Sequence, residues 1–216
     1  MLQMTIIATD IQNPDNTAVV AAVTALQNGD LVAYLTDTLY GLGGDARSRV
    51  AIEKIFALKG RATEKALPVI VGEKEIAKEY VEEIPAIAAT LIEQFWPGPL
   101  TLIFKAAANV LPELIGDSGK IAIRLPAAKL ACEISRTLGA PIIATSANRS
   151  GEPVLNSAKQ IAEMFEDRLA LILDSGPPLQ TKPSTIIDVT TQPPSLVRAG
   201  AVPVAEISKR IGELQT

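Results

Sequence analysis

The sequence predicts an α/β fold: a single domain with a twisted, open, mixed sheet and flanking helices. Patterns typical of helices and of strands alternate along the 216 residues, as expected when helices pack on a sheet. Hydrophobic residues make up 48% of the chain and aromatic residues only 4%, so the core must be large and mainly aliphatic. No repeat, low-complexity stretch or linker interrupts the pattern, so residues 1–216 are expected to form one domain.

Helices are predicted where apolar residues recur with helical spacing and capping residues flank the run. The first is capped by Asp15 or Asn16 and ends before Gly29, and the one that begins at Pro85 stops before a Pro-Gly-Pro turn. The predicted helices span residues 16–28, 50–58, 85–95, 128–138, 157–165 and 204–211.

Strands are predicted from short apolar runs bounded by glycine, proline or polar residues. The double prolines at 177–178 and 193–194 indicate turns rather than domain boundaries. The predicted strands span residues 31–35, 67–71, 100–104, 121–125, 141–145, 169–173, 185–189 and 196–197.

The absence of histidine excludes several classes of enzyme. With no histidine in the chain, a Ser-His-Asp triad, a Cys-His dyad and a histidine-ligated zinc site are ruled out. A general base must therefore be a carboxylate, a lysine or the substrate itself. Cys132 is the only cysteine, so no intrachain disulfide can form, and we interpret it as a small buried residue of a helix.

The chain is expected to be cytoplasmic and not to contact a membrane. Its first ten residues lack the basic and apolar regions of a signal peptide, and no apolar run approaches the roughly 18 residues of a membrane span. The net charge of −4 argues against a nucleic-acid coat protein but allows a local basic groove.

Four short blocks, far apart in the chain, are expected to converge on one anionic ligand. They mix small hydroxyl or amide side chains with glycine, and each lies beside an apolar run. Close backbone approach at glycines, hydroxyl donors and fixed cations together suit phosphate or carboxylate. The blocks are residues 36–46, 59–61, 146–151 and 183–185.

The first block contains Gly41-Leu42-Gly43-Gly44-Asp45-Ala46, which fits the G-x-G-x-x-A dinucleotide pattern only formally. Residues 36–40 separate it from the preceding strand, and the acidic residue expected about 20 positions on is missing, Glu64 being the nearest. We therefore interpret it as a tight turn that leads to the helix at Val50. No P-loop sequence occurs in the chain.

The cations of the second block have two interpretations. Lys59 and Arg61 follow an amphipathic helix, where positive charge stabilises the helix C-terminus without any role in binding. Ligand sites of open α/β sheets, however, form at strand ends, and further cations lie in such places: Lys65, Lys120, Arg124 and Arg198.

The third block, Ser146 to Gly151, follows a predicted strand. Its hydroxyl and amide groups suit the capping of the next segment as well as they suit phosphate oxygens. Spacing alone leaves these two interpretations equal.

At these blocks the chain resembles the YrdC-like family of threonylcarbamoyl-AMP synthases. The resemblance extends over roughly residues 15 to 200 in the family's order, which is far more specific than one motif. The chain ends soon afterwards, as in the short, single-domain form. The matching segments are TDTLYGLGGDA, KIFALKGR, FWPGPLTLIF, IAIRLP, PIIATSANRSGEP, ILDSGPP, PSTIIDV and LVRAG.

The resemblance implies a concave, basic cavity and a nucleotidyltransferase. Its substrates would be L-threonine, bicarbonate (or CO2) and ATP, and its products threonylcarbamoyl-AMP and pyrophosphate. Mg²⁺ would accompany ATP without protein ligands. A downstream threonylcarbamoyl-transferase complex would then modify the adenosine beside the tRNA anticodon, and tRNA or double-stranded RNA would be a further partner.

This chemistry agrees with a site that has no histidine. The amine of threonine captures CO2 to give a carbamate, whose oxygen attacks the α-phosphate of ATP and expels pyrophosphate. Because the nucleophile belongs to the substrate, the protein must supply only positioning and positive charge.

The resemblance implies a role for each matching residue. We expect Lys59 and Arg61 to be loop cations whose removal lowers activity with little loss of stability, and Arg124 to bind the carboxylate of threonine. The catalytic phosphate and carbamate pocket would be Lys59, Arg61, Ser146 and Asn148, with Lys65, Lys120 and Arg198 as further ATP contacts. The threonine contacts would be Thr38, Arg124, Ala144 and Ser184, with Thr36 and Tyr40 shaping the pocket.

The chain departs from the family at five positions. Leu35, Ala62 and Thr145 stand where proline is common, and Ile70 and Ala128 stand where relatives often have histidine. The last two leave the amino-acid substrate open, so a paralogue with another small substrate stays an alternative.

Two further alternatives concern other kinds of protein. A non-catalytic RNA-binding protein that uses the same basic cavity also stays open. A carbamoyl-transfer relative of hydrogenase maturation is disfavoured, because such proteins are larger and carry cysteine-rich zinc modules, whereas this chain has one cysteine.

Overall fold

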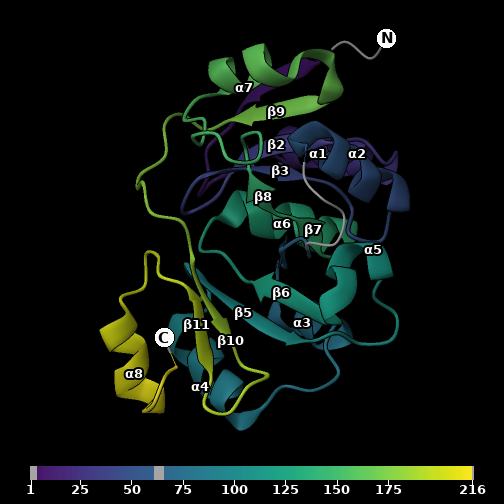
Figure 1. Cartoon of the computed structure of the whole chain (residues 1–216). Coiled ribbons are helices and arrows are strands. Elements are labelled where there is room, and N and C mark those ends of the chain that lie inside the picture. Colours follow the sequence, from purple (N-terminus) through teal and green to yellow (C-terminus); the bar gives the residue numbers. More distant parts are fainter. Residues whose placement is uncertain (1–3, 61–65, 216) are drawn as a thin grey trace.

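The strands of the chain form two mixed sheets, which lie one above the other in Figure 1. The structure is a computed structural model that describes residues 4–60 and 66–215. The first sheet has the strand order β1-β9-β2-β3-β8, and the second has the order β11-β10-β5-β6-β4-β7. The predicted α/β fold with a mixed sheet and flanking helices is confirmed, but the strands are divided between two sheets instead of one.

The first sheet combines parallel and antiparallel pairs. Strand β2 runs parallel to β9 and antiparallel to β3, which follows it directly in the chain. Its strands are β1 (Thr5–Ala8), β2 (Val32–Leu35), β3 (Tyr40–Gly43), β8 (Thr145–Ser146) and β9 (Leu171–Asp174).

The second sheet is mixed in the same way, since β5 runs parallel to β10 and antiparallel to β6. Its strands are β4 (Val69–Ile70), β5 (Leu100–Lys105), β6 (Lys120–Arg124), β7 (Ile142–Ile143), β10 (Thr185–Asp188) and β11 (Ser195–Arg198). The predicted strand at 141–145 is therefore two short strands, β7 and β8, which belong to different sheets.

All six predicted helices are present near their expected bounds. The Asp15 carboxylate accepts the N–H of Thr17, and the Ser157 hydroxyl accepts the N–H of Gln160, so both caps have the expected chemistry. Two shorter helices, α3 (Lys74–Glu79) and α5 (Pro112–Ile115), were not predicted. The six are α1 (Asn16–Gln27), α2 (Arg49–Lys59), α4 (Ala86–Phe95), α6 (Lys129–Leu138), α7 (Ala158–Phe165) and α8 (Val204–Ile211).

Strand β2 is buried on both faces, which explains its uninterrupted apolar sequence. Val32 and Tyr34 pack into a cluster that includes the apolar faces of α1 and α6. Ala33 and Leu35 face the larger core, which also contains apolar residues of the second sheet. No helix within the described residues is long and apolar enough to cross a membrane.

The glycine-rich block that we interpreted as a tight turn is strand β3 from Gly41 to Gly43, so that prediction is wrong there, and only its end turns toward α2, from Asp45 to Ser48. A Cβ atom at Gly43 would lie 2.6 Å from Cε1 of Tyr34 and 3.1 Å from Cγ2 of Ile142. The absence of a side chain is therefore what lets the Tyr34 ring pack across the β2–β3 pair. Glycine, which weakens a strand in general, is required here by close packing.

We expect Gly43→Ala to lower the free energy of unfolding by about 1–3 kcal/mol, because the new methyl overlaps a fully buried ring. Gly41→Ala is the matched control on the same strand, since its Cβ would meet its nearest neighbour, the carbonyl oxygen of Thr145, at 3.5 Å. Denaturant unfolding of the two variants measures the difference. Equal losses would show that strand propensity, not packing, explains the glycine.

Candidate functional site

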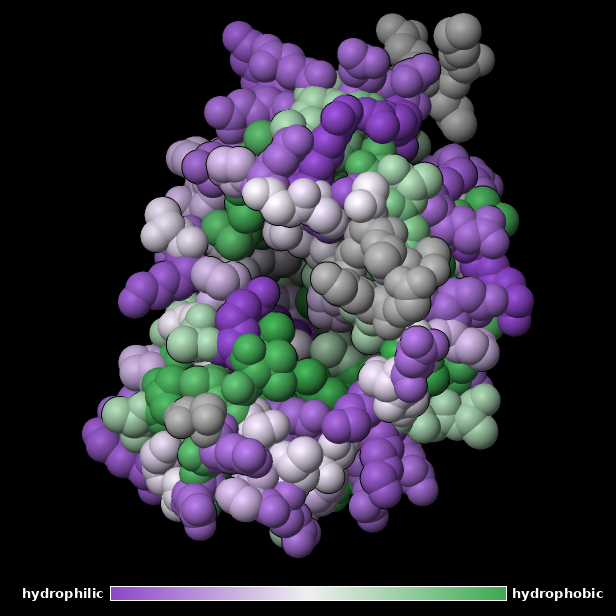
Figure 2. Space-filling view, in the orientation of Figure 1, coloured by the Kyte–Doolittle hydropathy of each residue, from purple (hydrophilic) through white to green (hydrophobic). Residues whose placement is uncertain are grey.

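The predicted blocks meet at a cavity of about 530 Å³ that is lined by residues of both sheets. Figure 2 shows the surface hollowed between the two halves of the molecule. The floor includes apolar side chains of the second sheet, such as Ile103, Ala122 and Ile186. Predicted site residues in the lining are Thr36, Thr38, Tyr40, Lys59, Arg124, Ala144, Ser146, Asn148, Ser184 and Arg198.

Lys59 ends helix α2 and points into the loop that follows β8. Its ammonium group donates hydrogen bonds to the carbonyl oxygens of Ser146 (2.7 Å) and Asn148 (2.9 Å) and to Oδ1 of Asn148 (3.0 Å). The residue is only 4% exposed. The expectation that Lys59 lies on a loop is therefore wrong, because it ends a helix and its buried ammonium bonds to the loop after β8. We now expect its removal to lower stability.

The serine-asparagine loop is organised around the Asn148 side chain. Oδ1 of Asn148 accepts from the Ser146 hydroxyl at 2.7 Å as well as from Lys59, and Nδ2 donates to the carbonyl of Glu152. The two interpretations of this block are thus not exclusive. The polar groups order the turn, and Ser146 and Asn148 still line the cavity.

Arg124, at the end of β6, connects the second sheet to the loop between β2 and β3. Its Nε donates to the carbonyl of Gly98 (3.0 Å), Nη1 donates to Oγ1 of Thr38 (3.0 Å), and Nη2 donates to Oδ1 of Asp37. Burial lowers the pKa of the Arg124 guanidinium, and the Asp37 carboxylate opposes that shift. The group remains a cation, since arginine is not deprotonated in proteins.

Thr36 gives the β2–β3 loop its shape. Its hydroxyl donates to the carbonyl of Leu39 (2.8 Å) and accepts the N–H groups of Thr38 and Leu39. The Thr38 hydroxyl consequently lies 3.0 Å from that of Thr36 and faces Arg124. Thr36 thus orients Thr38 toward the cavity.

Arg198, on β11, holds the fourth block, residues 183–185, by hydrogen bonds to Ser184. Its Nε and Nη2 donate to the carbonyl of Ser184 at 3.1 and 2.9 Å, and Nη2 also donates to the Ser184 hydroxyl at 3.1 Å. The close approach depends on Gly200, where a Cβ atom would lie 2.4 Å from the carbonyl oxygen of Pro183. This contact explains the glycine in the LVRAG segment.

The cavity has the electrostatic character expected of an anion site. Lys59, Arg124 and Arg198 line it, and none of its lining residues in the described part of the chain is Asp or Glu. Burial lowers the pKa of Arg198, and the nearby charge of Arg124 lowers it further. Two cations that destabilise each other attract a negatively charged ligand.

Tyr40 shapes the site through the segment that joins the two sheets. Its hydroxyl donates to the carbonyl of Gly176 (2.8 Å) and accepts the N–H of Ser175 (3.2 Å). Burial raises the pKa of Tyr40 to about 12, so the hydroxyl stays protonated at neutral pH. The connection from β9 to β10, on the left of Figure 1, is thereby fixed to β3.

Three predicted ATP contacts are not placed at the cavity. Arg61 and Lys65 lie outside the described residues. Lys120 is at the start of β6, is absent from the lining, and forms an ion pair of 2.8 Å with Asp188. Its role with ATP stays a prediction.

The structure separates the two positions where relatives often have histidine. Ile70, on β4, and Ala128, which precedes α6, are both buried in the cluster with α1 and α6, but Ile70 also lines the cavity and Ala128 does not. Only Ile70 can therefore influence the ligand by contact. Thr101 also lines the cavity, and the sequence analysis did not assign it a role although it lies in the FWPGPLTLIF segment.

Cys132 is not among the residues that line this cavity. Cys132 is buried as predicted, and burial raises the pKa of its thiol to about 11, so it is protonated at neutral pH. Within residues 4–60 and 66–215, no group of three or more Asp, Glu, Cys or His residues is arranged to hold a metal ion.

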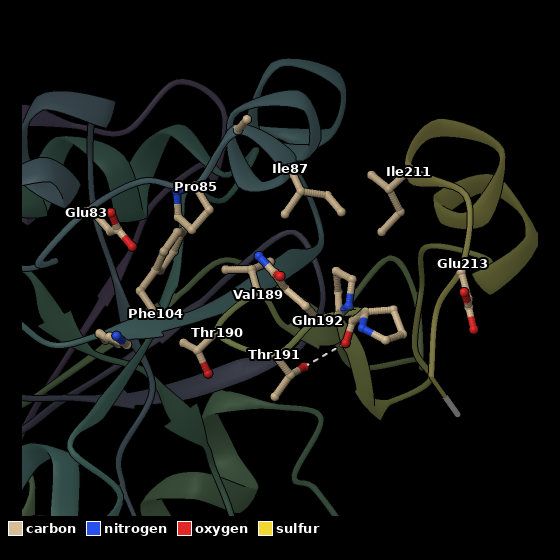
Figure 3. A pocket seen from close by; sticks show the side chains of 14 residues that line it. Glu83, Pro85, Ile87, Phe104, Val189, Thr190, Thr191, Gln192, Ile211 and Glu213 are labelled. Carbon is tan, nitrogen blue, oxygen red and sulfur yellow. Dashed lines mark hydrogen bonds between the residues drawn. The ribbon is translucent and has the colours of Figure 1, made fainter.

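A second cavity, of about 610 Å³, lies between α4, the turn after β10 and the end of α8 (Figure 3). Its lining includes Ile87 and Ile211 from the two helices, together with Glu83, Glu213 and a single lysine. Of the predicted site residues that the structure describes, none lines it. It lacks the clustered cations that make the first cavity suited to an anion.

We expect Lys59→Met to lower the free energy of unfolding by about 1–3 kcal/mol, because three loop acceptors lose their donor. Lys54→Met on the same helix is the control: Lys54 contacts Gly29 and Asp30 with its side chain 42% exposed, and the loss there should stay within about 1 kcal/mol. Thermal unfolding compares the two. Equal stabilities of the two variants would support the other interpretation, in which Lys59 only stabilises the C-terminus of its helix.

Comparison with known proteins agrees with this geometry. The chain matches the Sua5_yciO_yrdC family, described as "Telomere recombination", over residues 24–200. A threonylcarbamoyl-AMP synthase of Pyrococcus abyssi is 38% identical over 190 residues, which are 88% of this chain and 56% of that protein. The chain thus spans little more than half the length of this relative.

Solved structures show the same fold. The crystal structure of P. abyssi Sua5 complexed with L-threonine has a TM-score of 0.93 and 36% identity, and the match covers 98% of this chain and 62% of that one. E. coli YciO has a TM-score of 0.84 and 27% identity, with 94% and 98% covered. By its sequence match, its fold and the convergence of its motifs, the chain belongs to the Sua5/YciO/YrdC family.

Proposed function

We propose that the chain is an L-threonylcarbamoyladenylate synthase, a nucleotidyltransferase that combines L-threonine, bicarbonate (or CO2) and ATP. The observation that carries the proposal is one cavity in which phosphate-binding and carboxylate-binding groups lie together. Lys59, Ser146 and Asn148 line it beside Arg124 and Ser184. A relative named threonylcarbamoyl-AMP synthase and a Sua5 structure complexed with L-threonine support the choice of substrates.

The proposed reaction needs no protein nucleophile. The amine of threonine takes up CO2 and releases a proton to give the carbamate. A carbamate oxygen then forms a bond to the α-phosphorus of ATP as the bond to the pyrophosphate oxygen breaks. The protein contributes by holding these groups in line and by stabilising the negative charge that shifts onto the phosphates.

The cavity offers a partner for each end of the threonine. Arg124 uses three of its five N–H donors on Gly98, Thr38 and Asp37. One N–H on each terminal nitrogen is left for the amino-acid carboxylate, and Thr38 and Ser184 supply hydroxyls beside it. The carbonyl of Ala144 is the acceptor that we assign to the amine.

The nucleotide is assigned to the other side of the cavity. Lys59 would act on its phosphates by its positive charge, since its three N–H donors bond to the loop. Ser146, Asn148 and Arg61 would contact the phosphates, and Arg198, Lys65 and Lys120 would make further contacts. With no carboxylate among the described lining residues, Mg²⁺ is proposed to arrive on the phosphates of ATP and to supply additional positive charge there.

The physiological role is proposed to be the threonylcarbamoyl modification of the adenosine beside the tRNA anticodon in the cytoplasm, through a downstream transferase complex. Direct binding of tRNA or double-stranded RNA stays an alternative use of the basic cavity. Steep weakening of RNA binding with salt, without any pyrophosphate release, would favour it.

The decisive experiment measures pyrophosphate released from ATP in the presence of bicarbonate and single amino acids. We expect release that depends on L-threonine and falls at least about 100-fold in Arg61→Ala, because one fixed cation at the reacting phosphate contributes roughly 3 kcal/mol. Arg149→Ala, an exposed arginine outside the lining, is the control. Release without any amino acid, or none with threonine, would refute the proposal.

Substrate selectivity follows from Ile70. Because an apolar side chain stands at this lining position, we expect serine to be accepted within about tenfold to a hundredfold of threonine, since one methyl is worth only about 1–3 kcal/mol. Ile70→His should widen the preference for threonine, with Ile70→Val as control. A preference above about 1,000-fold in the unaltered chain would show that other residues discriminate. If another small substrate releases pyrophosphate faster than threonine and serine do, the result would favour the paralogue alternative.

A further inference from the structure

Thr101 is a polar residue of the cavity to which the proposed function gives no role. It lies on β5, is 3% exposed and lines the cavity. Its hydroxyl oxygen is 2.8 Å from that of Ser184, which directly precedes the neighbouring strand β10. Either hydroxyl can be the donor of this bond, and which one donates decides what the cavity offers to a ligand.

The contact with the Arg198 guanidinium shows how one acceptor site of the Ser184 hydroxyl is used. The guanidinium has only donors, and its Nη2 donates to the Ser184 hydroxyl oxygen at 3.1 Å. A hydroxyl oxygen has two acceptor sites and one proton, so one acceptor site of Ser184 is occupied. Donation by Thr101 would occupy the second, and the Ser184 proton would then be available only to the cavity.

The charge of Arg198 favours that polarity when an anion lies in the cavity. A cation that donates to a hydroxyl oxygen withdraws electron density and makes the hydroxyl a stronger donor, because successive hydrogen bonds polarise one another. The strengthened donor gains most from an anionic acceptor. Ser184, the hydroxyl that Arg198 contacts, is therefore the better donor to a carboxylate or carbamate oxygen in the cavity.

We propose that Thr101 is a positioning residue that donates to Ser184 and thereby directs the Ser184 hydroxyl proton at an oxyanion of the amino-acid substrate. The proposal rests on the proposed function for the identity of that substrate. Thr101 acts through Ser184 and makes no contribution of its own to the ligand. Its loss should thus affect amino-acid binding and leave ATP binding unchanged.

The test is a double-mutant cycle of Thr101→Val and Ser184→Ala, read by calorimetric titration of L-threonine and by KM for each substrate. We expect Thr101→Val, which keeps the shape of the side chain, to weaken threonine binding about threefold to tenfold, as the loss of one hydrogen bond requires. Thr101→Ser should restore binding to within about twofold. In the Ser184→Ala background, Thr101→Val should have no further effect.

Thr185→Val is the matched control. Thr185 is the next residue after Ser184 and is also buried, but its hydroxyl bonds to the backbone of Val202 and not to the cavity. It should lower the melting temperature without changing threonine binding. Where Thr101→Val does not fold, Thr101→Ala removes the same hydroxyl and takes its place in the cycle.

The outcomes separate this proposal from the function on which it rests. An undiminished effect of Thr101→Val in the Ser184→Ala background, no rescue by serine, or an equal rise in KM for ATP would overturn the positioning role. Threonine binding without pyrophosphate release would overturn only the proposed reaction. Failure of the unaltered chain to bind L-threonine would overturn both.

Discussion

The contacts of the Arg124 guanidinium determine how the two halves of the site face each other. One planar group bonds to the 97–99 turn, to Thr38 and to Asp37, so it joins β6 of the second sheet to the β2–β3 loop of the first. Because the fork of arginine donors has fixed geometry, three such bonds define the relative position of these segments. The cavity is the space left between them.

Asp37 offsets part of the cost of burying Arg124 and leaves the guanidinium positively charged. An arginine that is 6% exposed loses much of its hydration, and an adjacent carboxylate compensates for part of that loss. Asp37 is not a lining residue, so the compensation comes from behind the cavity surface. Arg124 therefore still lines the cavity as a cation, together with Arg198 and Lys59.

The same groups that would bind the ligand also order the loops around the cavity. Lys59 holds the 146–148 loop by its carbonyl oxygens, and Arg198 holds Ser184 through its backbone and side chain. Preorganisation of this kind reduces the ordering cost of binding. A substitution of Lys59 is therefore expected to change the order of this loop, whatever it does to a ligand.

The sequence by itself determined the α/β class, the order of the six longer helices and of most strands, and the blocks that meet at the cavity. Helical and strand periodicity, caps such as Asp15 and motif blocks such as TDTLYGLGGDA are local properties, so they can be read from neighbouring residues. Only the tertiary structure decided the division into two sheets, the strand conformation at Gly43, the burial of Lys59 and the pairing of Thr101 with Ser184. These depend on contacts between segments distant in sequence: Gly43 is explained by the ring of Tyr34, Lys59 by carbonyls 87 and 89 residues away. Ile70 and Ala128 looked equivalent as departures from the family, and both pack in the same core cluster, but only the tertiary structure shows that Ile70 also lines the cavity.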